Sequence, residues 1–455
     1  MRYLTVVTIL ILATGGLILT GCGNEKAAPA PEKAPVEQAP ADEAPAPAEA
    51  PAVEEVAAPA EAAYVIKPGP DVQTELQEAL IMAEPGDVIQ LEEGVFKLEL
   101  GLSLDVDNVT LRGRGMEKSI LDFKGQVAGA EGLHVTSDNV LLEDFAVIDT
   151  KGNGIKSHSA NNIIYRRIRA EWTAGPQTEN GAYGLYPVSS ENVLVEECIA
   201  IGGSDSGIYV GQSKNVIVRN CLAQFNVAGI EIENCHKADV IGCVATKNTG
   251  GILVFDLPDL PQQHGHDVRL LDNRVFGNNT PNFAPAGNIV GQVLAGTGIS
   301  VMANTNVEIF NNYIRDNDTT SIAIGSYFTT GNKIKDPEYY PYSERIHIHG
   351  NTLGPCGTKP DGEKGKLLEL AFGNPIPDIL WDGVTNPEKV KDGVFDKESR
   401  ILIGEGNVKE GGELTFGNIG GMVALTDPMN AEPSTDMSEN TGSYPAIAPV
   451  VIEGV

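Results

Sequence analysis

The sequence is short of positive charge, of paired cysteines and of long apolar runs. It has 32 Lys and Arg against 62 Asp and Glu, a formal net charge of -30, which argues strongly against nucleic acid as a partner. Five of the six cysteines follow Cys22, an odd number without metal-type spacing, and this argues against a disulfide framework or a zinc site. The apolar run Leu4 to Leu19 is shorter than the roughly 20 residues of a bilayer-spanning helix. We therefore assign no residue as a metal ligand and no membrane-spanning helix.

The first residues have the pattern of an export signal. Arg2 precedes the apolar run, and small residues follow it up to Cys22, so residues 1–21 are predicted to be a cleaved signal peptide. The tetrapeptide from Leu19 to Cys22 resembles the lipobox of bacterial lipoproteins. That resemblance implies acylation of the Cys22 thiol and anchoring to a membrane. Because residue 23 is Gly and not Asp, it also implies the outer membrane as the location in the cell envelope.

The segment 22–63 is predicted to be the lipidated cysteine followed by a disordered linker. After Cys22 it is built from Ala, Pro and Glu, with nine acidic residues, two lysines and no aromatic residue. Such a composition cannot bury enough apolar surface to offset its ordering entropy. Removing Arg2 (+1) and the linker (-7) from the total of -30 leaves -24 on the body. A body this acidic disfavours a polyanionic ligand unless basic groups gather in one place.

A repeat of about 22 residues dominates the body and predicts its fold. Pairs of glycine with an aliphatic residue recur at steps of 22, 30, 23, 22, 22 and 47 residues. The pairs begin at Gly132, Gly154, Gly184, Gly207, Gly229, Gly251 and Gly298. Two short alternating strands and turns at this period are typical of one coil of a parallel β-helix. We therefore predict an all-β fold, a right-handed parallel β-helix over residues 64–353.

A second track of residues runs in phase with the first. Runs of valine and isoleucine end in a cysteine or an asparagine, at Cys198, Cys221, Cys243, Asn273, Asn312 and Asn351. Identical positions in successive coils stack about 4.8 Å apart. We therefore predict one inward Cys/Asn ladder in which the cysteines are buried and inert.

Irregular steps and the two ends complete the predicted organisation. Insertions are expected at about 171–182, 278–296 and 326–343, and loops of this kind wall the groove of a solenoid. Residues 71–83 have a helical spacing of apolar residues, at Val72, Leu76, Leu80 and Ile81, and are predicted to cap the first coil, followed by a strand at 88–91. Residues 354–455 are predicted to be an irregular region packed on the last coils.

The outward side of the glycine track contains the candidate site. Side chains alternate along a strand, so residues next to the aliphatic position face outward. Abstracting the proton beside the carboxylate of a uronate sugar requires a cation, a base and a proton donor. Lys156 or an arginine (Arg166, Arg167 or Arg169) is predicted to neutralise the carboxylate, and His158 or Tyr183 to exchange the proton. The predicted substrate-binding residues are His134, Tyr186, Tyr209, Gln212, Glu231 and Glu233.

Two other interpretations of these residues stay open. Outward rows of Lys, Tyr and Glu also stabilise an ordinary β-surface through cross-strand pairs. Glu231 and Glu233, with Asp205 or Asp256, have the oxygen ligands that Ca²⁺ prefers, so Ca²⁺ is the candidate cofactor.

The segment from Gly154 to about Ala303 resembles a family of exported bacterial parallel β-helix lipoproteins, of the pectate-lyase-like superfamily. Residues 183–187, 207–212 and 251–258 carry this match. More distantly it is similar to the alginate C5-epimerases, whose catalytic strand reads Tyr-Gly-aromatic-Asp-Pro-His. Here Tyr183, Gly184 and Pro187 match, whereas Tyr186 and Val188 replace the Asp and the His. The resemblance implies a carbohydrate ligand, with epimerisation, or β-elimination by Tyr183 and Lys156, as the reaction.

A non-enzymatic role is the alternative. The repeats also resemble coiled periplasmic accessory proteins of metalloenzyme maturation. The lipoprotein family implies a periplasmic partner such as a c-type-cytochrome-like protein, which the aromatic loop around Tyr339 and Tyr340 would grip. Any haem would belong to that partner, because this sequence has no Cys-x-x-Cys-His motif.

Overall fold

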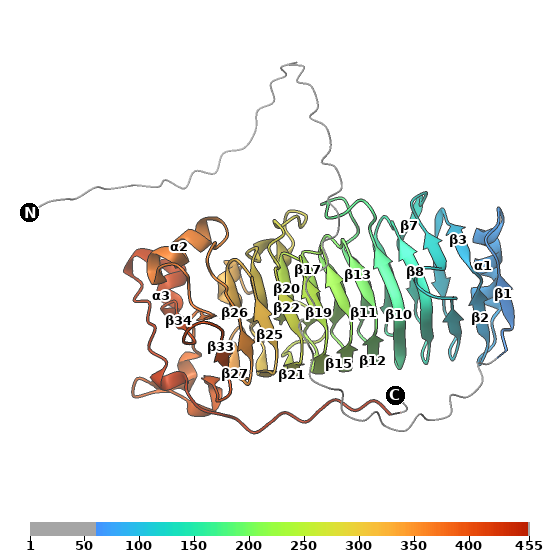
Figure 1. The fold of residues 1–455 in the computed structure, drawn as a ribbon. Coiled ribbons are helices and arrows are strands. Elements are labelled where there is room, and N and C mark those ends of the chain that lie inside the picture. Colours follow the sequence, from blue (N-terminus) through green and yellow to red (C-terminus); the bar gives the residue numbers. More distant parts are fainter. Residues whose placement is uncertain (1–60, 454–455) are drawn as a thin grey trace, which may run out of the picture. The chain divides into compact units, whose positions relative to one another are not determined.

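The computed structural model describes residues 61–453, which form a β-solenoid (Figure 1). The predicted signal peptide, Cys22 and nearly all of the linker lie outside the described residues. Among the described residues, 21 strands form one parallel sheet, called sheet A, and 11 form a second, called sheet B. A typical coil contributes two strands to sheet A and one to sheet B, whereas the repeat predicted two strands per coil.

The bounds of the elements follow from this winding. Sheet B consists of β4 (Leu100–Leu104), β7 (Ala128–Val135), β9 (Asn153–His158), β11 (Tyr183–Val188), β14 (Ser206–Gly211), β17 (Ala228–Glu233), β20 (Gly250–Phe255), β23 (Thr297–Met302), β26 (Thr320–Gly325), β29 (Ile379–Trp381) and β34 (Phe416–Asn418).

Sheet A consists of β1 (Tyr64–Ile66), β2 (Val88–Leu91), β3 (Gly94–Lys97), β5 (Thr110–Arg112), β6 (Ser119–Asp122), β8 (Leu141–Ile148), β10 (Ile163–Glu171), β12 (Glu191–Glu196), β13 (Ile199–Ile201), β15 (Lys214–Arg219), β16 (Leu222–Gln224), β18 (His236–Ile241), β19 (Val244–Thr246), β21 (His266–Leu271), β22 (Arg274–Phe276), β24 (Thr305–Phe310), β25 (Tyr313–Arg315), β27 (Glu344–His349), β28 (Thr352–Leu353), β32 (Ile401–Ile403) and β33 (Val408–Lys409). A separate antiparallel pair is formed by β30 (Val390–Lys391) and β31 (Val394–Phe395).

Helices are few. The α-helices are α1 (Val72–Met82), α2 (Gly362–Phe372) and α3 (Gly421–Thr426), and the 3-10 turns are η1 (Ile289–Gln292), η2 (Tyr327–Thr330), η3 (Pro387–Lys389), η4 (Lys397–Ser399), η5 (Pro428–Asn430) and η6 (Ser438–Asn440). No helix of the described part of the chain is long and apolar enough to cross a membrane.

The aliphatic residues of the glycine track form the inner face of sheet B. They pair in parallel from coil to coil, for example Leu185 with Ile208 and Ile208 with Ile230, and are fully buried. The glycine before each is required because the next coil approaches closely. A Cβ atom at Gly154 would lie 2.4 Å from the carbonyl oxygen of Gly184. The predicted repeat is thus confirmed, and its glycines set the spacing between coils.

The predicted N-terminal cap is confirmed, with one exception. The helix α1 buries Leu76 and Leu80 in the main core, and β2 begins and ends where the sequence predicts. Ile81, which belongs to the apolar spacing of the predicted helix, is 63% exposed and lies outside the core. Ala79 takes the fourth buried position of α1 instead.

The inward Cys/Asn ladder is confirmed by its hydrogen bonds. The backbone N–H of Cys243 donates to Oδ1 of Asn273, and the same contact repeats from Asn273 to Asn312 and from Asn312 to Asn351. The cysteines of residues 61–453 are all buried and free of disulfides. Cys235 does not belong to this ladder, as it lies at a different turn, between β17 and β18.

The predicted end of the β-helix at residue 353 is too early. The strands β29, β32, β33 and β34 pair in parallel with β26, β27, β28 and β29, so one more coil reaches Asn418. The ladder continues with it, because Asn351 N–H donates to Oδ1 of Asn407. The inserted helix α2 and the β30–β31 hairpin lengthen this coil and hide its period in the sequence.

Residues 354–455 were predicted to pack on the last coils. The last described residues leave those coils instead. Residues 443–453, called the strap, extend back along sheet A and are drawn in red in Figure 1. The N–H of Ile447 donates to Glu308 on β24, and the N–H of Val450 donates to Asp239 on β18. Ile452 packs on Leu194 and Ile217. The strap therefore covers part of the outer side of sheet A.

Candidate functional site

Apart from the arginines, the predicted site residues lie on the outer side of sheet B, on or directly after five successive strands from β7 to β17. In one row, His134 pairs with Lys156, Lys156 with Tyr186, and, further along, Tyr209 with Glu231. In the neighbouring row, His158 pairs with Val188, and Gly211 with Glu233. The structure thus brings the predicted residues onto one face, with histidines and lysine at one end and carboxyls at the other.

Three tyrosines occupy the middle of this face. The ring centroid of Tyr183 lies 4.5 Å from that of Tyr186 and 4.6 Å from that of Tyr209, and the Tyr186 and Tyr209 centroids are 5.0 Å apart. Tyr209 is buried, whereas Tyr183 and Tyr186 are half-buried. Aromatic rings that are partly exposed on a groove are platforms on which the faces of sugar rings pack. We call these three residues the tyrosine cluster.

The basic end of the face is built around Lys156. Its Nζ lies 5.1 Å from the Tyr186 ring centroid and 3.9 Å from a carboxylate oxygen of Glu131. His158, two residues further on the same strand, is exposed. Burial lowers the pKa of His134, whose Nε2 atom is buried without a hydrogen bond partner in the described part of the chain. An anion that reached this end would meet Lys156 and His158 first.

The acidic end is almost closed to solvent. Asp205, Glu231 and Glu233 are buried, and Glu231 is only 2% exposed. The Ser206 hydroxyl donates to Glu231 and to Asp205, and Asn288 Nδ2 donates to Asp205 Oδ2 at 2.8 Å. Burial raises the pKa of Asp205 to about 6 and that of Glu233 to about 7, and it raises the pKa of Glu231 well above its usual range. These carboxyls therefore hold protons at pH values where exposed ones are ionised.

Tyr183 joins the two ends. Burial, and then the charges of Asp205 and Glu231, raise the pKa of its hydroxyl well above the usual range. The hydroxyl is therefore neutral at physiological pH, and it makes no hydrogen bond to any of residues 61–453. An unpartnered phenol is available to a ligand, and its raised pKa keeps the proton on the oxygen until a stronger base accepts it.

Gln212 has an indirect place in this arrangement. Its Nε2 donates to the Tyr209 hydroxyl at 3.0 Å and to Glu233 Oε1 at 3.2 Å. It therefore orients Tyr209 and Glu233, and its amide is engaged within the protein.

The arginines considered for the site are not in it. Arg166, Arg167 and Arg169 lie on β10, which belongs to sheet A. They pair with carboxylates of that sheet, Arg166 with Glu196 at 2.5 Å and Arg167 with Asp144 at 2.6 Å. The prediction that an arginine neutralises the substrate is therefore wrong, and Lys156 remains as the cation.

The two long insertions cover the far end of the outer face of sheet B. Val290 of the first and Tyr327 and Tyr339 of the second are buried in a cluster with Leu253 and Phe255 of β20. The Tyr339 hydroxyl donates to the backbone carbonyl of Asp256. Tyr339 is thus engaged inside the protein, and the contact of this loop with a partner stays a prediction. Tyr340 is half-buried and donates to Glu344 at 2.6 Å.

The acidic end does not have the ligand arrangement of a Ca²⁺ site. Oxygens of Glu231 and Glu233 already accept hydrogen bonds from Ser206 and Tyr209. Among residues 61–453, one group of three side chains brings its ligand atoms within 4.8 Å of one another: Glu308, His347 and His349 on sheet A. None of these three residues was among the predicted site residues. The alternation Ile346-His347-Ile348-His349 could have indicated the group, because it places two imidazoles on one side of a strand.

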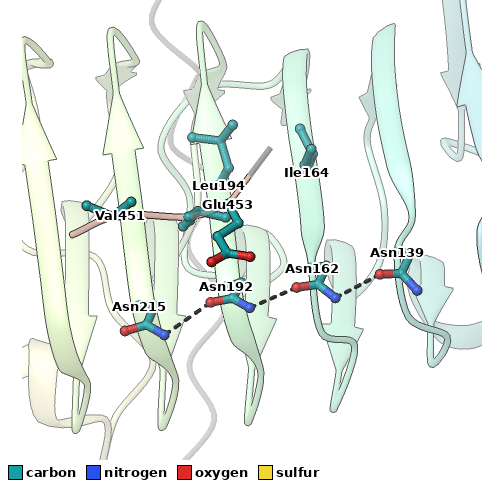
Figure 2. A pocket seen from close by; sticks show the side chains of 9 residues that line it. Asn139, Asn162, Ile164, Asn192, Leu194, Asn215, Val451 and Glu453 are labelled. Atoms are coloured by element: carbon teal, nitrogen blue, oxygen red, sulfur yellow. Dashed lines mark hydrogen bonds between the residues drawn. The ribbon is translucent and has the colours of Figure 1, made fainter. Parts of the chain in front are cut away.

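A cleft on sheet A lies between the end of the strap and a row of asparagines that are exposed or half-buried. Figure 2 shows the amides of Asn215, Asn192, Asn162 and Asn139 bonded in a row, with donor to acceptor distances of 3.1, 2.8 and 2.7 Å. Glu453 and Ile452 form the other wall. Because the asparagine amides mainly bond to one another, this row stabilises the turns of the coils.

Comparison with known proteins shows the fold. Residues 108–259 match the family described as the right handed beta helix region. This chain is a right-handed parallel β-helix protein. Among curated proteins, none matches the sequence significantly.

One solved structure supports this fold, and two others are similar to a lesser degree. The A-module of the mannuronan C-5 epimerase AlgE4 of Azotobacter vinelandii has a TM-score of 0.50 and 16% identity, covering 74% of this chain and 91% of the module. The AlgE6 A-module of the same organism has a TM-score of 0.45 and 15% identity, covering 75% and 94%. An alginate lyase from Paenibacillus sp. has a TM-score of 0.39 and 16% identity, covering 78% and 98%. The predicted distant similarity to alginate epimerases is thus confirmed at the level of the fold.

Proposed function

We propose that this β-helix protein binds an anionic, uronate-containing polysaccharide on the outer face of sheet B and abstracts the proton at C5 of the sugar. The observation that carries the proposal is the position of Tyr183, a neutral and unpartnered phenol within 4.6 Å, centroid to centroid, of both Tyr186 and Tyr209. The epimerase module that shares the fold is named for an activity on mannuronan, a uronate polymer, and this supports the same ligand class here.

Binding follows from the charges at the basic end. The Lys156 ammonium pairs with the sugar carboxylate, and Tyr186 beside it packs on the sugar ring. Neutralising the carboxylate lowers the pKa of the adjacent C–H, which is what makes proton removal feasible. The acidic end does not repel the ligand below about pH 6, because its carboxyls are largely protonated there.

Proton transfer uses one group on the strand of Lys156 and one on the neighbouring strand β11. His158, exposed on the same strand, accepts the C5 proton as the neutral imidazole. Tyr183 donates its proton to the other side. If that proton goes to the glycosidic oxygen at C4, the chain is cleaved by β-elimination; if it goes to C5, the sugar is epimerised. The same groups account for both outcomes, and product analysis distinguishes them.

The experiment follows both products with the full chain and a panel of alginate, pectate and glycosaminoglycan polymers. Ultraviolet absorbance detects the conjugated double bond of elimination, and deuterium uptake at C5 in D₂O detects proton exchange. We expect turnover on at least one polymer and a loss of about 100-fold or more in Tyr183→Phe. Tyr64→Phe is the control, because Tyr64 bonds to Met82 at the N-terminal cap, outside the site.

Absence of both signals across the panel contradicts proton abstraction. Isothermal titration with uronate oligomers then tests the binding half of the proposal separately. If neither turnover nor binding is found, the whole proposal fails.

We further propose that the protein is attached to the outer membrane through a lipid on Cys22. The support is the tetrapeptide before and including Cys22, followed by Gly23 and the acidic linker. Expression with labelled palmitate should label the protein, and Cys22→Ser should abolish the label and release the protein from the membrane fraction. An unlabelled protein, or a Cys22→Ser protein that stays in the membrane, contradicts the anchor.

A further inference from the structure

A second group of chemistry-bearing side chains lies on sheet A, apart from the proposed saccharide groove. Glu308 is on β24, and His347 and His349 are on β27, the next strand. Glu308 and His347 are direct partners in the parallel register. Ile346 and Ile348, which alternate with the histidines, are fully buried in the core. The two imidazoles therefore both project to the outer side of the sheet, where Glu308 also lies.

The three side chains converge on one point. Nε2 of His349 lies 3.0 Å from Oε1 of Glu308, and Nδ1 of His347 lies 4.0 Å from the same oxygen. Ligands of one zinc ion, each about 2.0–2.1 Å from the metal, are separated by roughly 3.3 Å in a tetrahedron. These two separations bracket this value, and the ligand atoms of all three side chains lie within 4.8 Å of one another, so one ion can reach all three after an adjustment of the side chains.

His347 lacks the partners that its burial requires. His347 is only 7% exposed, and neither of its ring nitrogens has a hydrogen bond partner in the described part of the chain. Buried polar atoms are almost always paired, and an unpaired one calls for an explanation such as an ion. A metal ion bound to Nδ1 would supply the missing partner on the side that faces Glu308.

The surroundings hold the three ligands in place. The His349 ring stacks on Phe310, with centroids 5.1 Å apart and planes at 4°. The second oxygen of Glu308 accepts the N–H of Ile447 in the strap at 3.1 Å. On the other side of His347, a Cβ atom at Gly404 would lie 2.7 Å from Nε2, so only glycine leaves room for the ring there. Such outer contacts orient metal ligands and raise their affinity.

One cation lies nearby, and its charge is already balanced. Arg269 pairs with Glu308 across β21 and β24, but its guanidinium donates two hydrogen bonds to Asp239. Tyr444 of the strap approaches His347 edge-on at 6.2 Å between centroids. Glu308 is therefore the acidic side chain of this cluster, and its Oε1, which lies 3.0 Å from His349 Nε2, is the oxygen that an ion would take up.

We propose that Glu308, His347 and His349 bind one divalent first-row transition ion of the Zn²⁺ class. Two imidazoles and one carboxylate are the ligands that such ions select, whereas Ca²⁺ requires six to eight oxygens and Cu⁺ prefers thiolate or thioether sulfur. Three protein ligands leave a fourth position, and the partly exposed side of His349 provides access to it. The site joins β24, β27 and the strap, because Glu308 contacts all three.

The test is titration of the metal-free full chain with Zn²⁺ by calorimetry and with Co²⁺ by its visible absorption. We expect one ion per chain, a tetrahedral Co²⁺ spectrum and a rise in thermal unfolding temperature that depends on Zn²⁺ concentration. His349→Ala should weaken binding at least tenfold and remove the Co²⁺ spectrum, and His347→Ala should do the same. His236→Ala is the matched control, because His236 stacks on His266 on the same sheet at 4.4 Å and is not one of the three ligands.

The result that overturns the proposal is absence of binding by the parent chain, or binding that His347→Ala and His349→Ala leave unchanged. Circular dichroism and thermal unfolding of each variant without metal show whether it is folded. His349 is the more exposed ligand, so loss of binding in folded His349→Ala carries the conclusion even if His347→Ala unfolds. Because the saccharide assays use sheet B, their result does not bear on this site.

Discussion

The Tyr209 hydroxyl donates a hydrogen bond to the Glu233 carboxyl between neighbouring strands of sheet B. Both side chains are buried at the acidic end of the proposed groove. Burial raises the pKa of Glu233 from an ordinary value near 4.5 to about 7. The protonation state of the Glu233 carboxyl therefore affects the free energy of unfolding.

The first prediction concerns the dependence of stability on pH. A carboxyl whose pKa is higher in the folded state than in the unfolded state stabilises the fold fully below the unfolded value and loses this effect as the pH rises through the folded value. Burial also raises the pKa of Asp256 to about 7. Because of Glu233 and Asp256, the free energy of unfolding should fall between about pH 4.5 and 7.5. Glu233→Gln should reduce that fall by roughly 3 kcal/mol. Urea unfolding at a series of pH values measures it.

Glu191→Gln is the control for this prediction, because Glu191 is exposed on β12. Its curve should parallel that of the parent chain. If Glu233→Gln also parallels the parent, the carboxyl does not hold its proton in the folded state and the account of the acidic end is wrong.

The second prediction concerns Lys156 as the cation for the sugar carboxylate. Lys156→Met keeps most of the aliphatic stem and removes the charge. The affinity for a uronate oligomer should fall about tenfold, since a hydrogen bond to a charged group contributes about 1.5 kcal/mol or more. The salt dependence of binding should fall with it, and calorimetry at two ionic strengths measures both.

Lys214→Met provides the comparison, because Lys214 is exposed on β15 of sheet A. Equal affinities of the Lys156 and Lys214 variants would place the ligand elsewhere.

How far the sequence predicts the molecule depends on which features repeat. The inward positions from Leu133 to Ile299 follow a glycine in every coil and were predictable. The next coil has Ser321 before Ile322, and after it α2 separates Ile322 from its partner Ile379, so the repeat could not be followed there. Residue spacing detects a coil only while the turns stay short.

The face on which the site residues lie was predictable, but the way the insertions cover that face was not. Alternation along a strand places Lys156, Tyr186 and Glu231 on one face. It does not tell how insertions fold, and it is the contact of Asn288 with Asp205 that closes the acidic end. The sheet to which the arginines of β10 belong was not predictable either. It depends on the number of residues in each turn, which the repeat does not give.

The third prediction compares two members of one ladder. The Asn312 amide accepts from the N–H of Asn273 and donates to the Leu270 carbonyl at 2.8 Å, whereas Cys221 makes only weak sulfur contacts at 3.3 Å and beyond. Asn312→Ala leaves several buried backbone groups without partners and should cost about 3 kcal/mol of unfolding free energy. Cys221→Ala should cost about 1 kcal/mol, the effect of a small cavity. Equal losses in denaturant unfolding would show that the ladder stabilises by packing and not by hydrogen bonds.

The last prediction concerns the strap. Ile452 is 8% exposed on Leu194 and Ile217, whereas its neighbour Val451 is 75% exposed. Ile452→Asp would bury a charge on an apolar surface, so the end of the strap should detach and be cleaved by protease faster than in the parent chain. Val451→Asp adds the same charge one residue away, where it stays in solvent, and should leave the cleavage rate unchanged. Hydrogen exchange of the Ile447 and Val450 amides, which donate to Glu308 and Asp239, tells how far the detachment spreads. Faster exchange at Val450 alone would mean that Ile452 holds only the end of the strap. Faster exchange at both amides would show that the strap detaches as one unit. Identical cleavage rates of the Ile452→Asp and Val451→Asp variants would contradict the role of Ile452.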